Sequence, residues 1–323
     1  MDVFRLRDEM IRDYEEYARS FVDIRDDRIR ETVDAEIERG LLWPEPLVQL
    51  NPSFETGSTV DDLVDAGTLH QRCRTIFRRD KTDGHGGSAL RLYRHQEEAL
   101  HKAREGRNYV LTTGTGSGKS LAYIIPIVDA VLRAEQAPGI KAIVVYPMNA
   151  LANSQEEELA KFLGRMSAEP APPVTYRRYT GQESQSDRDE IRKNPPDILL
   201  TNFVMLELIL TRVFERDLIA STKSLQFLVL DELHTYRGRQ GADVAMLVRR
   251  LREYSESSQI RFVGTSATIA GAGTRGQQQA EIAAIGTRIF GDTVEPSDIV
   301  GESLRRITND DSDTDAFTNT LAR

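Results

Sequence analysis

Residues 108–120 carry the sequence NYVLTTGTGSGKS, in which a short apolar run leads into a glycine-rich turn. Lys119 marks the expected start of a helix. Such a turn points successive backbone N–H groups into one concavity, and the helix N-terminus adds the positive end of its dipole, so the segment suits a polyphosphate. The stretch therefore predicts a strand, a phosphate-binding loop and a helix in direct succession.

Each residue type in this loop has an expected chemical role. We expect Lys119 to reach the β- and γ-phosphates of ATP and the hydroxyl of Ser120 to ligand Mg²⁺. Thr113 stands where the usual G-x-x-x-x-G-K-[ST] pattern has its first glycine. A flexible loop beside a surface lysine is the alternative, and the flanking strand and helix favour the phosphate site. The predicted cradle comprises Thr113, Gly114, Thr115, Gly116, Ser117, Gly118, Lys119 and Ser120.

Downstream of residue 89, short apolar runs alternate with helical stretches. This alternation indicates a parallel sheet that helices cover on both faces. The predicted fold class is α/β, with a doubly wound, mostly parallel sheet whose ligand site lies at the carboxyl ends of the strands. The expected strands lie within 108–113, 141–147, 174–180, 197–202, 225–232 and 260–267.

Two adjacent carboxylates follow one of these runs, in the segment LVLDELH at 228–234. Asp231 is suited to hold Mg²⁺, and Glu232 to orient and deprotonate an attacking water. Alone, such a pair would more often mark a solvated helix start. The phosphate loop a hundred residues earlier reverses that balance, so Lys119, Asp231 and Glu232 are the predicted catalytic residues.

The N-terminal part of the chain has a different pattern. Apolar positions recur every three or four residues over 3–39, which predicts one or two amphipathic helices. Three prolines in 41–57 predict an extended segment. A short helix is expected over 60–77, followed by a polar, glycine-rich loop. The predicted division is an N-terminal helical region over 1–88, a main domain over 89–290 and a linker or tail over 291–323.

Composition excludes several classes of protein. The net charge of −9 is the opposite of the basic footprint of a small DNA-binding module. The longest apolar stretch, near 121–132, is interrupted by Pro126 and Asp129 and falls short of the roughly 20 residues of a membrane span. Cys73 is the only cysteine, so no intramolecular disulfide is possible and a cytoplasmic location is expected.

In motif content and order, residues 91–270 resemble superfamily-2 helicases of the DEAD/DEAH type. TGTGSGKS at 113–120 fits that group's A/T-x-x-G-x-G-K-[ST] loop, so the threonine at its start is expected there. RLYRHQ at 91–96 resembles the Q motif, and GTSATI at 264–269 resembles the Ser-Ala-Thr motif. The resemblance implies a RecA-like fold and further residues at the ATP site. Tyr93, Arg94 and Gln96 would contact the adenine. His234, Ser266 and Thr268 would couple ATP hydrolysis to movement.

Three further segments, at 146–155, 179–182 and 199–206, resemble strand-gripping motifs of this family. In relatives such segments touch the sugar–phosphate backbone, so contact here would be independent of base sequence. Taken singly, each is more often a turn after a strand. The implied nucleic-acid contacts are Met148, Asn149, Thr180, Gly181, Thr201 and Asn202.

Two sequence segments point to one branch of this family, YPMNALANSQ and DELHTYRGRQGADVAMLVRRLR. They are most similar to the bacterial branch related to the mitomycin-repair helicase and to DISARM and Druantia phage-defence helicases. This implies an ATP hydrolase that moves on DNA rather than RNA, in phage defence or DNA repair, with other defence-system proteins as partners. An ATP-dependent clamp or scaffold that does not unwind, and an RNA helicase, remain alternatives.

No second RecA-like set of motifs follows residue 270. We expect that the second RecA-like domain, which supplies arginine fingers to the ATP cleft, is missing from this sequence. An arginine finger contributes about 10³–10⁵ in rate. This chain alone is therefore expected to bind ATP and Mg²⁺ but to hydrolyse ATP slowly.

Overall fold

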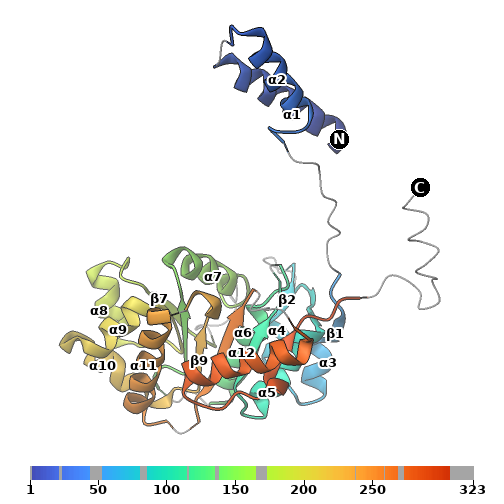
Figure 1. Cartoon of the computed structure of the whole chain (residues 1–323). Coiled ribbons are helices and arrows are strands. Elements are labelled where there is room, and N and C mark those ends of the chain that lie inside the picture. The colour runs from blue at the N-terminus through green and yellow to red at the C-terminus, as the bar shows by residue number, and fades with distance from the viewer. Residues whose placement is uncertain are drawn as a thin grey trace. The chain divides into compact units, whose positions relative to one another are not determined.

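The structure is a computed structural model that describes residues 2–21, 24–43, 53–80, 86–114, 116–134, 138–164, 173–236, 238–257, 259–267 and 273–305. The chain divides into two compact units, Met1–Pro52 and Ser53–Arg323 (Figure 1). The division at Ser53 differs from the expected boundary after residue 88. Residues from 60 onwards pack into the core of the larger unit, and this packing moves the boundary.

The smaller unit contains two helices, α1 (Val3–Ser20) and α2 (Asp27–Glu38), as the apolar spacing predicts. Each helix begins at an aspartate, Asp2 or Asp26, whose side chain accepts hydrogen bonds from free N–H groups of the first turn. Arg19 of α1 pairs with Asp34 of α2. Much of the predicted extended segment, over 44–52, lies outside the described residues.

The larger unit begins with small elements. Strand β1 (Thr56–Thr59) pairs antiparallel with β4 (Arg91–Tyr93), and β2 (Arg78–Arg79) pairs antiparallel with β3 (Ser88–Ala89). The prediction of one helix over 60–77 is wrong. Two short helices form, α3 (Val60–Asp65) and α4 (Cys73–Ile76), because Gly67 between them takes a left-handed φ of 70°.

A seven-stranded sheet forms the centre of the larger unit, and every neighbouring pair in it is parallel. The strand order is β11-β5-β10-β9-β6-β8-β7. All six predicted strands are present, so the α/β class is confirmed. The seventh, β11, is three residues long and lies in the segment expected to be a linker. The strands are β5 (Tyr109–Thr112), β6 (Ala142–Tyr146), β7 (Tyr176–Tyr179), β8 (Ile198–Asn202), β9 (Phe227–Leu230), β10 (Arg261–Ser266) and β11 (Ile299–Gly301).

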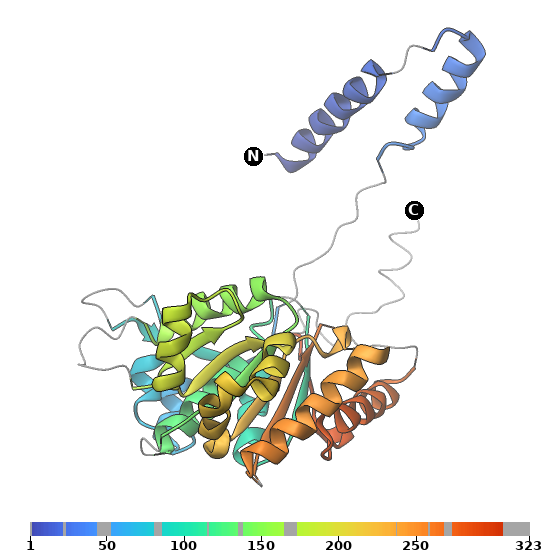
Figure 2. The ribbon, with the colours of Figure 1, turned by 90° about the vertical axis from the view of Figure 1, so that its left-hand side faces the viewer.

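Helices cover both faces of this sheet (Figures 1 and 2). In β9, Phe227 and Val229 face one core while Leu228 and Leu230 face the other, as the two-residue period of a strand requires. One core takes helices α5 (Arg94–Arg104), α6 (Leu121–Arg133) and α7 (Asn149–Phe162). The other takes α8 (Gln185–Lys193), α9 (Phe203–Thr211), α10 (Arg216–Ala220), α11 (Gly238–Ser255) and α12 (Arg275–Phe290).

Helix α6, which follows the phosphate loop, contains a proline in its interior. Pro126 has no N–H, so the carbonyl of Ala122 loses its usual partner four residues on. The buried hydroxyl of Tyr109 on β5 donates to that carbonyl at 3.0 Å. A side chain from the neighbouring strand therefore satisfies the group that the proline leaves free. Within the described part of the chain, no helix is both long and apolar enough to span a membrane.

Candidate nucleotide and nucleic-acid site

The glycine-rich loop lies between β5 and α6, at the carboxyl edge of the sheet. Gly116 and Gly118 have φ values of 79° and 69°, which are strained for residues with a Cβ. A Cβ at Gly118 would stand 2.6 Å from the amide nitrogen of Gln96. Helix α6 begins two residues after Lys119, so the loop and the helix N-terminus together form the expected phosphate cradle.

The side chain of Thr113 has a structural role in the loop, which a glycine at this position could not have. Its hydroxyl lies 2.7 Å from the hydroxyl of Ser117, and both side chains are buried. This hydrogen bond closes the loop on itself across its base. Thr115 lies outside the described residues.

Residues of the RLYRHQ segment form hydrogen bonds to backbone carbonyls of the loop. The amide of Gln96 donates to the carbonyl of Gly118 at 2.8 Å, and its oxygen accepts the N–H of Tyr93 at 2.9 Å. His95 Nε2 lies 2.9 Å from the carbonyl of Ser117. Gln96 still has one N–H and one oxygen lone pair available for a base. In this structure its first role is to hold the loop.

Burial sets the charge state of His95. The ring is almost fully enclosed, and burial lowers its pKa below the ordinary value of 6.5. The neutral ring donates from Nε2 to the loop carbonyl. Its Nδ1 is buried and has no hydrogen-bond partner among the described residues.

Asp231 and Glu232 follow β9 at the same edge of the sheet. Glu232 takes a left-handed conformation with φ 54° and ψ 54°, which is strained for a residue with a side chain. This conformation turns the chain sharply after Asp231. Because strain of this kind persists only where the surroundings enforce it, the neighbours of Glu232 are part of the site.

Thr265 on β10 supplies one of those neighbours, and the sequence analysis missed it. Its hydroxyl donates to a carboxylate oxygen of Asp231 and accepts the N–H of Glu232 at 3.1 Å. Burial raises the pKa of Asp231, this hydrogen bond lowers it, and the charge of Glu232 raises it again. Thr265 lies beside the predicted Ser266 in the same motif, and it contacts the carboxylate of Asp231 and the backbone N–H of Glu232.

The predicted catalytic side chains meet in space. Lys119 Nζ lies 3.7 Å from a carboxylate oxygen of Glu232, and the other oxygen lies 3.1 Å from Nδ1 of His234. His234 Nδ1 is also 3.3 Å from the hydroxyl of Ser266. The structure thus joins the loop, the DELH segment and the Ser-Ala-Thr segment through four side chains. Thr268 lies outside the described residues.

These residues fit ATP with Mg²⁺. Lys119 Nζ is buried and has no hydrogen-bond partner in the described part of the chain, so it is a cation that a phosphate would satisfy. Ser120 precedes the first turn of α6, and the carboxylate of Asp231 belongs to the hard oxygen donors that Mg²⁺ prefers.

An aromatic cluster beside the loop contains the predicted Tyr93 together with Phe54 and His95, which were not predicted as site residues. The Tyr93 ring stacks on His95 with centroids 5.7 Å apart, and the Phe54 ring lies 5.3 Å from Tyr93. Arg94, which is also expected at the adenine, pairs with Glu55 at 2.9 Å in this structure. Phe54 is placed here by an antiparallel bridge to Leu304, a contact across 250 residues that no local pattern indicates.

Another missed residue is Glu302, which the sequence assigned to the tail. Its carboxylate accepts the N–H of Gly114 at 2.9 Å, at the start of the phosphate loop. Strand β11 runs directly into this position from its pairing with β5. The residue that directly follows β11 therefore contacts the phosphate loop.

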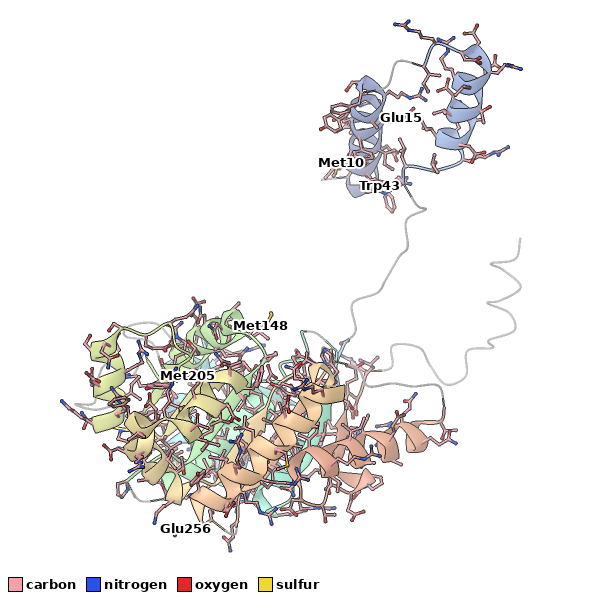
Figure 3. All side chains as sticks on the ribbon, turned by 60° about the vertical axis from the view of Figure 1, so that its left-hand side comes forward. Met10, Glu15, Trp43, Met148, Met205 and Glu256 are labelled. Atoms are coloured by element: carbon pink, nitrogen blue, oxygen red, sulfur yellow. The ribbon has the colours of Figure 1, made fainter. Side chains whose placement is uncertain are left out.

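Five of the six predicted nucleic-acid contacts line one pocket of about 400 Å³ next to the ATP site. They come from the ends of β6, β7 and β8, which lie side by side in the sheet. Met148 is 57% exposed and projects from the same edge at which Met205 lies, while Glu256 marks the opposite edge (Figure 3). The predicted residues in this pocket are Met148, Asn149, Thr180, Gly181 and Asn202.

Hydrogen bonds fix the walls of this pocket. Asn202 donates to Asn149 at 2.6 Å and to the carbonyl of Thr180 at 3.2 Å. Glu183 accepts the N–H groups of Thr180 and Gly181, each at 2.8 Å. The sixth predicted contact, Thr201, is fully buried and its hydroxyl donates to the carbonyl of Tyr179 at 2.7 Å. In this structure Thr201 ties two strands together and does not face the pocket.

Comparison with known proteins agrees with this geometry. Residues 93–274 match the family model described as DEAD/DEAH box helicase. The chain is 33% identical over 189 residues to the uncharacterized ATP-dependent helicase YprA of Bacillus subtilis, covering 58% of this chain and 24% of that protein. It is 24% identical over 336 residues to the Druantia protein DruE of Escherichia coli, covering 69% and 18%.

A similar solved structure is the crystal structure of the DUF1998 helicase MrfA bound to DNA, with a TM-score of 0.60 and 25% sequence identity. The match covers 78% of this chain and 29% of that one. The branch expected from the sequence is confirmed by these relatives. The chain spans less than a third of the length of each of them.

Proposed function

Because the chain belongs to the DEAD/DEAH box helicase family, we propose that residues 53–305 bind ATP with Mg²⁺ and couple its hydrolysis to movement on DNA. The observation that carries this proposal is the meeting of Lys119, Asp231, Glu232 and the His234–Ser266 pair at one sheet edge. The pocket at Met148 lies at the same edge.

The roles follow from the chemistry of each side chain. Lys119 would hold the β- and γ-phosphates, and Ser120 and Asp231 would hold Mg²⁺, which neutralises charge on the phosphates when bound. Glu232 would position the attacking water and accept its proton. Before nucleotide binds, Lys119 is paired with Glu232, so the phosphates must take Lys119 from that carboxylate.

Nucleic acid is proposed to lie across the pocket at the ends of β6, β7 and β8. The exposed polar groups there are hydroxyls, amides and backbone N–H groups, which suit sugar and phosphate rather than base edges. DNA is preferred to RNA in this proposal because MrfA, a relative of similar fold, was solved with DNA. A setting in phage defence or DNA repair is part of the proposal because the sequence resembles helicases of both settings, and the similarity to a Druantia protein agrees with that resemblance.

Rapid hydrolysis is proposed to need a second RecA-like domain that supplies arginine fingers. The purified chain alone is therefore expected to bind ATP and to turn it over slowly, whether or not DNA is present. A steady-state ATPase assay tests this, because fast turnover by this chain that DNA stimulates further would contradict it.

The central experiment measures nucleotide binding and nucleotide-dependent binding to single-stranded DNA, duplex DNA and RNA. Lys119→Ala is expected to weaken ATP binding at least tenfold, since a charge-assisted contact contributes about 1.5–3 kcal/mol. Glu232→Gln is the matched control, because it removes the competing partner of Lys119 and should leave ATP binding intact or stronger. Unchanged ATP affinity in Lys119→Ala would refute the site.

The same measurements separate the proposed motor from its alternatives. Equal affinity for RNA and DNA would favour an RNA helicase. An ATP-dependent clamp predicts that ATP changes DNA affinity while strand separation stays absent even when a second RecA-like domain is supplied.

A further inference from the structure

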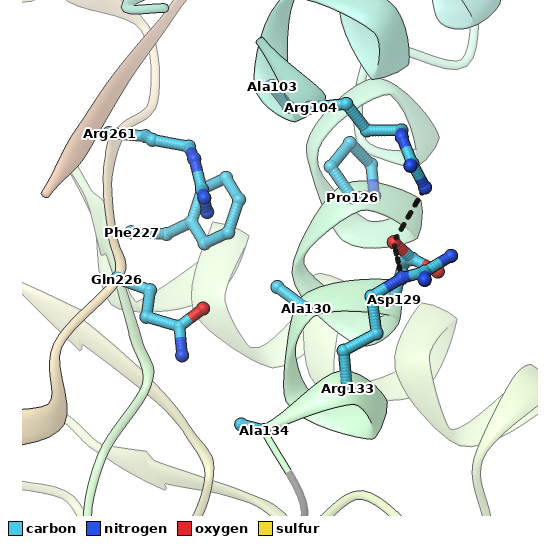
Figure 4. A pocket seen from close by; sticks show the side chains of 10 residues that line it. All are labelled: Ala103, Arg104, Pro126, Asp129, Ala130, Arg133, Ala134, Gln226, Phe227 and Arg261. Atoms are coloured by element: carbon cyan, nitrogen blue, oxygen red, sulfur yellow. Dashed lines mark hydrogen bonds and ion pairs between the residues drawn. The ribbon is translucent and has the colours of Figure 1, made fainter. Parts of the chain in front are cut away.

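A cavity of about 330 Å³ lies at the amino edge of the central sheet, away from the ATP site (Figure 4). One wall is formed where β9 and β10 begin, at Gln226, Phe227 and Arg261. Strand β10 has six residues and runs from this cavity to Ser266. At about 3.3 Å per residue, roughly 17–20 Å separate the two edges.

Small side chains on the opposite wall explain why space remains there. Ala130 and Ala134 of the α6 region, with Pro126 and Ala103, face the ring of Phe227 across the cavity (Figure 4). Protein interiors are normally packed to crystal density, and a core helix facing a strand commonly carries leucine or isoleucine. Alanines at these positions leave space in the cavity and give this wall an apolar surface.

Two of the three arginines at the cavity already have partners. Asp129 accepts from Arg133 Nε at 2.9 Å, lies 3.9 Å from Arg104, and accepts the N–H of His70 at 2.6 Å. Both arginines also donate to the carbonyl of Thr68. As cations in the last turns of α5 and α6, they offset the negative ends of the helix dipoles.

Arg261 differs from these two arginines. Its guanidinium lies over the Phe227 ring, 4.8 Å from the centroid, and points into the cavity (Figure 4). Its Nε is buried without a hydrogen-bond partner among the described residues, and none of their carboxylates forms an ion pair with it. Contact with the ring face leaves the in-plane N–H donors directed into the cavity, and a partly desolvated cation of this kind favours an anion.

We propose that this cavity binds a small organic anion whose carboxylate or phosphate group pairs with Arg261. Three arginines face one carboxylate there, so the lining has a net charge of +2. The ligand's apolar part packs against the alanines of α6, and its size is limited because the cavity is near the small end of ligand sites. The planar fork of donors on Arg261 suits either anionic group.

The test is a titration of the full chain with benzoate and with phenyl phosphate, in which ligand-observed NMR detects binding. Saturable binding of one or both is expected, and the stronger probe identifies the preferred anionic group. Benzamide has the shape of benzoate without its charge and should not bind. Arg261→Gln should weaken binding at least tenfold, and Ala130→Leu, which fills the cavity and leaves Arg261 in place, should abolish it.

Two controls keep the result decisive. Lys119→Ala removes the cation of the proposed ATP site and should leave probe affinity unchanged. If Arg261→Gln does not fold, Arg261→Lys keeps the charge but loses the fork, and it should also weaken binding. Loss of binding in Lys119→Ala with retention in Arg261→Gln, binding of benzamide as tight as benzoate, or no saturable binding of either probe would overturn the proposal.

Discussion

Replacing Thr265 with valine tests whether its hydroxyl holds the carboxylate of Asp231 and the backbone of Glu232 in place. Valine has nearly the same shape, so the fully buried site acquires no cavity. The substitution removes a hydrogen bond to the charged Asp231, which contributes about 1.5–3 kcal/mol, and leaves the N–H of Glu232 unsatisfied, which costs about 1–3 kcal/mol. We expect the free energy of unfolding to fall by about 3 kcal/mol, because the two losses partly overlap.

Urea unfolding of the chain without nucleotide measures this change. Thr265→Ser is the matched control, because it keeps the hydroxyl and removes only the methyl group. A second readout is ADP affinity with and without Mg²⁺. Thr265→Val should lose most of the Mg²⁺-dependent part of ADP affinity, since Asp231 loses the donor that holds its carboxylate in place, while ADP affinity without Mg²⁺ should change little.

This role of Thr265 is refuted if the free energies of unfolding of the valine and serine variants differ by less than about 1 kcal/mol. That difference is the lower limit for the cost of a buried donor without a partner. The role is also refuted if both variants show the parent's Mg²⁺ dependence. A stability loss with unchanged Mg²⁺ dependence would mean that Thr265 supports only the fold.

Three further predictions concern the loop and its surroundings. Gly118→Ala should destabilise the chain about 1 kcal/mol more than Gly106→Ala, because both positions have positive φ but only Gly118 would meet a neighbouring amide; urea unfolding measures both, and equal losses would contradict the clash. Tyr109→Phe should cost about 1–2 kcal/mol in the parent and almost nothing together with Pro126→Ala, which restores an N–H to the carbonyl that the tyrosine serves; the same cost in both backgrounds would refute this pairing. Because burial lowers the pKa of His95 below 6.5, the unfolded chain binds its proton first as pH falls, so the stability that the neutral ring contributes is complete above pH 6.5 and is lost below it. Thermal unfolding between pH 7.5 and 5 should show this loss, by up to about 1.4 kcal/mol per pH unit, and His95→Gln should reduce the slope.

The sequence predicted the fold class because its signals are local. Most of the predicted strands are near-continuous apolar runs, since both faces of a parallel sheet are buried, and the exception is the edge strand β7 with Arg177 and Arg178. The glycines at 116 and 118 mark a turn whose positive φ angles few other residues tolerate. Errors occurred where the signal was short, as for the three-residue strand β11, or where a single glycine divided a helical pattern, as at Gly67.

Within the site, the sequence by itself determined which residues bear the chemistry: Lys119, Asp231 and Glu232 stand in segments whose residue types and order predict phosphate and metal chemistry. Only the tertiary structure decided what holds them. Thr265, Phe54 and Glu302 reach the site through strand pairing between segments far apart in the chain, and Arg261 was singled out only by the cavity around it. Strand order and side-chain packing are set by the free energy of burying the whole core, so no local pattern of residues records them.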